Sequence, residues 1–162
     1  ELLMTLPVSV TQTVVGKFLA AWIFTGIALV LTFPMWITVN FLGNPDNGVI
    51  ITSYLGSLLM AGGYLSIGSC ISSLTKNQVI AFVVSISVCF LFTVSGLPIV
   101  LNFFSSWTPQ ALLDTIASFS FVSNFTDLTK GVIDIRNIIY FLSLIVGSLS
   151  LNILSINSRK GI

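Results

Sequence analysis

Few side chains in this sequence could take part in acid–base, nucleophilic or metal chemistry. The 162 residues include only 11 charged residues and two cysteines, and there is no histidine. Without an imidazole the chain cannot form a Ser-His-Asp or Cys-His nucleophile, a histidine metal site or a histidine pH switch. It also has no glycine-rich loop ending in Lys-Ser/Thr that would bind ATP phosphates. We therefore expect no catalytic, cofactor-binding or metal-binding residues in this chain.

The two cysteines are not expected to form a disulfide. If Cys70 and Cys89 lie on antiparallel helices that turn near residue 76, they differ in depth by roughly 10 Å at 1.5 Å per residue. A disulfide needs Cα atoms within about 7 Å of each other. Both thiols should therefore be free and behave as small apolar side chains.

The composition excludes most soluble classes of protein. Charged residues make up 7% of the chain, hydrophobic residues 55%, and the mean hydropathy is +1.06. A soluble domain usually has about a quarter charged residues, so a water-soluble enzyme is excluded, as are disordered and collagen-like chains. The net charge of +1 leaves no basic face for nucleic acid.

The spacing of the charges predicts a polytopic membrane protein. The charged residues are separated by four long uncharged intervals, each longer than the roughly 20 residues that cross a bilayer core as a helix. Helices are expected because lipid offers no hydrogen bonds to the backbone, and alternation typical of barrel strands is absent. We predict one all-α transmembrane domain over residues 1–162, with four spans at about 18–42, 49–74, 78–101 and 137–156.

Helix-capping and turn residues coincide with the ends of these segments. Ser9 to Gln12 and Thr75 to Gln78 each match a capping box, and Asp134 is a suitable N-cap for the last span. The run Asn44 to Gly48 is rich in turn formers. Pro34 lies inside the first span and predicts a kink there.

The segment 102–136 is too polar and too short in its apolar runs to span. Thr108 followed by Pro109 predicts the start of one short helix, and a second is expected over residues 124–130, ending at Gly131. Two interpretations remain open: short helices lying in or dipping into the outer interface, or an ordinary external loop with helical turns.

The basic residues predict the orientation. Four of the six fall on one side of the expected spans, which places both ends in the cytoplasm by the positive-inside tendency. These four are Lys17, Lys76, Arg159 and Lys160, whereas Lys130 and Arg136 fall on the other side.

Small residues recur at helical spacing in the second and fourth spans. Such residues let membrane helices approach closely, and a polar transport path is the less favoured explanation because no charge accompanies them. The expected helix-packing residues are Ser57, Ala61, Gly62, Ser66, Gly68, Gly147 and Asn152.

Several stretches resemble one membrane protein family. The run Glu1-Leu-Leu-Met-Thr-Leu-Pro-Val-Ser9 followed by Val15-Gly-Lys-Phe-Leu19 resembles the signature of ABC-2 type transporter permeases. The runs 42–46, 72–78 and 130–136 are similar to the branch of that family associated with gliding motility and multicopper-enzyme maturation.

The resemblance implies a permease of the bacterial inner (plasma) membrane. Such permeases have six membrane helices, so this chain would be a C-terminal fragment with the last four. A second permease subunit and a separate ATPase subunit, which binds ATP and Mg, would be the partners. The resemblance also implies that a short cytoplasmic coupling helix docks into the ATPase; its residues here would be Glu1, Leu2, Leu3, Met4 and Leu6.

Three functions are compatible with these observations. The leading hypothesis is a transmembrane transport subunit of an ABC exporter, which is not itself an enzyme. The alternative is a non-transporting membrane scaffold or anchor derived from such a permease. A membrane-embedded enzyme ranks third, because no paired ionisable residues lie within the expected spans.

Overall fold

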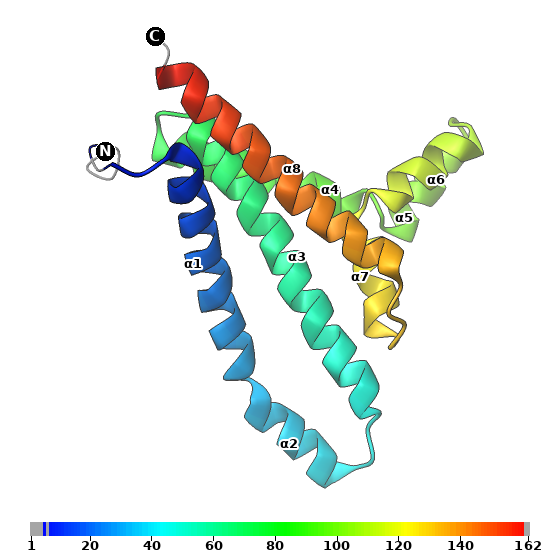
Figure 1. Ribbon diagram of the computed structural model, residues 1–162. Helices are drawn as coiled ribbons and strands as arrows, with labels where there is room; N and C mark the ends of the chain where they lie inside the picture. Colours follow the sequence, from blue (N-terminus) through cyan, green and yellow to red (C-terminus); the bar gives the residue numbers. More distant parts are fainter. Residues whose placement is uncertain (1–4, 6, 161–162) are drawn as a thin grey trace.

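The computed structural model describes Thr5 and residues 7–160, and every regular element in that part of the chain is a helix. The helices form an elongated bundle with a side arm made of α5 and α6 (Figure 1). Their bounds are α1 Val10–Val30, α2 Phe33–Leu42, α3 Asn47–Leu74, α4 Gln78–Val94, α5 Pro98–Ser105, α6 Gln110–Ser118, α7 Phe121–Thr129 and α8 Ile135–Lys160.

Three of these elements are long and apolar enough to cross a membrane, or four if a bent pair is counted. The three are α1 and α2 together (Val10–Leu42), α3, and α8 over Ile135–Arg159. The bent pair is α4 with α5. The predicted all-helical class is therefore confirmed, and three or four segments are suitable for crossing a membrane.

The third predicted span, 78–101, is not one straight helix. α4 ends at Val94, and α5 leaves at an angle of 72°. The break follows from Pro98, which lacks an amide hydrogen and disfavours helical backbone at the residue before it. Leu97 is accordingly extended, with φ −71° and ψ 135°.

The first predicted span also differs from expectation. Helix begins at Val10, eight residues before the predicted start, and is interrupted at Leu31 and Thr32. Pro34 lies in the first turn of α2, where a proline is tolerated because that amide has no intrahelical partner. The predicted kink is therefore present just before the proline.

The capping predictions are confirmed at two helices and wrong at a third. Ser9 and Gln12 form a capping box with both bonds at 3.2 Å, and Asp134 accepts from the Arg136 amide at 2.9 Å. Thr75 does not cap α4, because Asn77 accepts from the Val79 amide at 2.9 Å. An Asx side chain reaches the amide two residues ahead.

Thr108 does not cap α6. The residue at the N-cap position is Pro109, and no side chain bonds to the first turn. The second short helix exists as predicted but starts earlier, at Phe121, and Gly131 follows it with φ +83°. That left-handed conformation favours glycine.

α3 is the central helix, with α1 antiparallel and α8 parallel to it (Figure 1). Trp22 of α1 donates to the Leu58 carbonyl at 2.8 Å. Along α8, Asn152 donates to Ser69 Oγ at 2.7 Å and Arg159 to the Leu74 carbonyl at 2.5 Å. The start of α1, the α3–α4 turn and the end of α8 therefore share one end of the bundle.

We call this end the basic end, defined by Lys17, Lys76 and Arg159. Of the described acidic residues, Asp46 caps the opposite end of α3. The other three lie on α6, on α7 and just before α8. The described basic end therefore carries cationic residues without acidic ones.

Candidate functional site

Two short helices share one side of α3. α4 runs along the half of α3 nearest the basic end, and Thr93, next to its last residue, bonds to Tyr64 through their hydroxyls at 2.5 Å. α7 continues along the other half: Phe121 lies against Gly63, and Gly131, just past its end, lies against Val49. α4 and α7 together therefore follow α3 over most of its length.

The end of α4 and the start of α7 meet at what we call the α4–α7 junction. It comprises residues 94–97 and 119–121, and Gly96 lies directly against Ser120. The junction lies beside the middle of α3, as its contacts with Gly63 and Tyr64 show. α5 and α6 form the excursion between its two halves (Figure 1).

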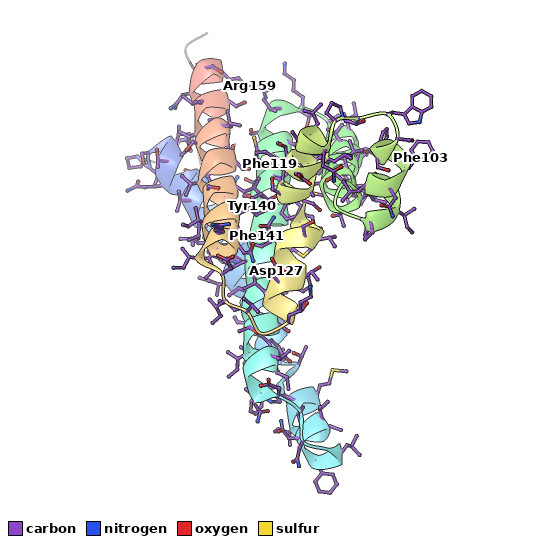
Figure 2. All side chains as sticks on the ribbon, turned by 90° about the vertical axis from the view of Figure 1, so that its right-hand side faces the viewer. Phe103, Phe119, Asp127, Tyr140, Phe141 and Arg159 are labelled. Atoms are coloured by element: carbon purple, nitrogen blue, oxygen red, sulfur yellow. The ribbon has the colours of Figure 1, made fainter. Side chains whose placement is uncertain are left out.

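Side chains satisfy the backbone polar groups that these helix ends leave unpaired. Asn124, which is 8% exposed, donates to the carbonyls of Ser118 and Ser120 at 2.9 and 2.8 Å. Ser120 Oγ accepts from the Val122 amide at 3.2 Å. Tyr140 of α8 donates to the Phe119 carbonyl, and Figure 2 shows Tyr140 between Phe119 and Phe141 along the bundle. Lipid cannot supply such hydrogen-bond partners. These side-chain bonds therefore stabilise the chain at the α4–α7 junction, where the helices are interrupted.

An aromatic cluster centred on Phe121 fills the space beneath the junction. The Phe121 ring is fully buried, with ring centroids 4.6 Å from Tyr64, 5.6 Å from Phe92 and 5.9 Å from Phe141. Aromatic pairs at these separations add to the burial energy. The cluster joins α3, α4, α7 and α8 at one point.

Glycines allow the backbones to come this close. A Cβ atom added to Gly63 would lie 2.7 Å from the Phe121 ring, and one added to Gly56 would lie 3.0 Å from Leu128 Cβ. A Cβ on Gly96 would overlap Ser120. At these three positions a side chain would force α7 away from its neighbours.

The helix-packing residues predicted on α3 occupy different environments. Gly62 faces Ile145 and Trp22, with an added Cβ 3.0 Å from both, and Ser66 is fully buried. Ser57 and Ala61 are half-buried, and the Ser57 hydroxyl donates to the carbonyl one turn earlier at 2.8 Å.

Two predicted packing glycines have no close neighbour. An added Cβ at Gly68 or Gly147 would meet nothing within 4 Å. At Gly68 the reason is a cavity of about 520 Å³ that separates α3 from α4, lined also by Ser72 and Gln78. Asn152, by contrast, is 3% exposed and bonds to Ser69 across the α3–α8 contact.

The predicted coupling residues lie outside the described part of the chain. They are Glu1, Leu2, Leu3, Met4 and Leu6.

Within Thr5 and residues 7–160, no three His, Cys, Asp or Glu residues gather into a metal-binding group. Cys70 and Cys89 are free and half-buried. Residues of this part of the chain do not by themselves suggest a bound metal.

Sequence reasoning missed the junction. Neither Phe121 nor the hydroxyls of Tyr64, Thr93 and Tyr140 follow a recognisable motif, because their contacts join distant parts of the chain. The available signal was Gly96-Leu-Pro98 in the third apolar segment, which is a typical helix break.

Comparison with known protein families, with characterised proteins and with solved structures finds no match to this chain. Its function must therefore be inferred from its residues and their geometry.

Proposed function

We propose that this chain is a membrane-spanning permease subunit of an ATP-driven exporter of the ABC-2 type. In this proposal a separate ATPase subunit binds ATP and Mg, and a second permease subunit completes the transport pathway. The chain would lie in a bacterial inner membrane with the basic end in the cytoplasm. The observation that carries the proposal is the α4–α7 junction.

The junction supports transport because, if α4 and α7 form one membrane crossing, it interrupts that crossing near its middle. Transporters place discontinuous helices at this depth, where unwound backbone lines a site or path. An uninterrupted helix pairs its backbone groups within itself, whereas here the side chains of Ser120, Asn124 and Tyr140 pair backbone groups at the helix ends. A packed contact of this kind can exist in two discrete arrangements, which is what alternating access requires.

The coupling residues provide the test of the proposal. In membranes containing an ABC ATPase encoded beside this chain, Leu6→Asp should weaken co-purification of the ATPase at least about tenfold (~1.4 kcal/mol), because a carboxylate in an apolar groove loses its hydration. Leu42→Asp is the matched control: Leu42 is 80% exposed on α2, away from the basic end, and this variant should retain the ATPase.

Two results would contradict the proposal. Equal retention of the ATPase by both variants would remove the docking role of residues 1–6. If the ATPase is retained but its hydrolysis rate is the same with and without this chain, a scaffold that recruits the ATPase without coupling explains the binding better.

A further inference from the structure

A polar cavity at the basic end is separate from the junction and does not depend on the proposed transport function. Its volume is about 230 Å³, and it lies where α1, α3 and α8 converge. Apolar residues cover most surfaces of these helices, so a polar cavity among them is exceptional. Its lining residues are Thr13, Val14, Lys17, Ser69, Ser72, Ser73, Asn152 and Ile156.

The cavity contains an unpartnered buried polar atom. Asn152 lines it and is only 3% exposed; its amide nitrogen donates to Ser69 Oγ at 2.7 Å. Its carbonyl oxygen Oδ1 is buried and has no hydrogen-bond partner among the described residues. Leaving such an acceptor unpaired is costly, so a hydrogen-bond donor that reached Oδ1 would stabilise this end of the bundle.

Three donors line the same cavity. Lys17 has no ion-pair partner, and Ser72 has no hydrogen-bond partner, in the part of the chain that the structure describes. The Ser69 hydroxyl accepts from Asn152 and retains its own proton for another acceptor. Lys17 and Ser72 are exposed, so an ammonium group and two hydroxyls along this cavity are available to an oxyanion.

From these groups we infer that the cavity binds the phosphate headgroup of an anionic phospholipid. The phosphate oxygens would accept from Lys17, Ser69 and Ser72, and a headgroup hydroxyl would donate to Asn152 Oδ1. A phosphatidylglycerol headgroup has both features.

The surroundings favour a lipid over free phosphate. Basic pockets between membrane helices are typical lipid headgroup sites, and no described acidic residue lies at the basic end to repel an anion.

The test is a titration of the detergent-purified protein with phosphatidylglycerol, followed by the rise in unfolding temperature. The wild type should be stabilised by phosphatidylglycerol more than by phosphatidylcholine with the same acyl chains. Lys17→Gln should weaken the apparent affinity about fivefold, the usual effect of one lysine near an anionic headgroup. Ser72→Ala should weaken it with no change in net charge.

Lys76→Gln is the matched control, since it removes one cation from the same end but outside the cavity. It should keep the wild-type affinity. Equal losses in Lys17→Gln and Lys76→Gln, or equal stabilisation by both lipids, would overturn the inference. Stabilisation by inorganic phosphate or glycerol phosphate that abolishes the lipid effect would overturn the lipid assignment in favour of a soluble phosphate.

Discussion

Among single residues, four glycines determine how closely the helices approach at the centre of the bundle. Gly96, Gly63, Gly62 and Gly56 each face a side chain that an added methyl group would strike. Elsewhere in the described chain a glycine has open space: Gly147 has no neighbour within 4 Å. The same substitution should therefore have opposite effects at the two kinds of position.

Gly96→Ala should lower the free energy of unfolding by about 1–3 kcal/mol, as overpacking does in close-packed interiors. The new methyl group would displace Ser120, and with it the first turn of α7. Thermal or denaturant unfolding in detergent measures the change.

Gly147→Ala is the control for that experiment. It adds a methyl group in open space within a helix, where alanine is favoured over glycine by up to about 1 kcal/mol. Unchanged or increased stability is expected. If Gly96→Ala were as stable as Gly147→Ala, the close contact between α4 and α7 would be wrong.

The roles of some residues could be predicted from their sequence neighbours, whereas the roles of others could not. The capping box of Ser9 and Gln12 and the cap at Asp134 involve neighbours in sequence, so their bonds could be foreseen. At the α3–α4 turn both Thr75 and Asn77 could have capped the start of α4. Asn77 does so, and the hydroxyl of Thr75 donates to the Ile71 carbonyl instead. Sequence spacing alone could not show that Gly62 is packed and Gly68 is not. The difference arises because α4 lies away from α3 at Gly68.

At the scale of elements, α7 is a packed part of the bundle, and α5 and α6 are a peripheral arm. Phe121 and Leu128 of α7 are fully buried. Phe103 on α5 is 72% exposed, on the arm that Figure 2 shows away from α8. Of the two interpretations of 102–136, a plain loop is thus excluded for α7.

Phe121→Ala should reduce the free energy of unfolding by about 3–5 kcal/mol, the usual cost of emptying an aromatic core site. It should also speed hydrogen–deuterium exchange of the α7 amides, because Phe121 is the contact that holds the start of α7 against α3. Phe103→Ala removes an equal ring from an exposed position and should change neither quantity. Similar behaviour of the two variants would contradict the buried position of α7.

Hydropathy predicted which segments are long and apolar enough to span a membrane, but it did not predict the helix break in the third segment. The apolar segment from 78 to 101 is long enough to span a membrane. Segment length and hydropathy do not register a helix break, so the break from Gly96 to Pro98 did not change the prediction. In the proposed crossing the second half is α7, which its polar residues made look like a loop in the sequence. Contacts with Gly56 and Gly63 of α3, formed between residues more than 50 positions apart, hold α7 in place.

At the scale of the whole molecule, the bundle has a basic end and an opposite end. Arg159 bonds to Leu74 at the first, and a cavity at the second is lined by Asp46 and Lys130. If α4 and α7 together form one membrane crossing, as we propose, residues 78 and 130 lie on opposite sides of the membrane. The proposed coupling depends on this sidedness, because the basic end must face the ATPase in the cytoplasm.

Cysteine labelling in sealed membrane vesicles tests this claim most directly. In a background with Cys70→Ala and Cys89→Ala, single cysteines at the exposed positions 76 and 158 should react with a membrane-impermeant maleimide from one side. Cysteines at positions 44 and 130, also exposed, should react only from the other side. Reaction of positions 76 and 158 from different sides, or of position 130 from the same side as position 76, would contradict the account.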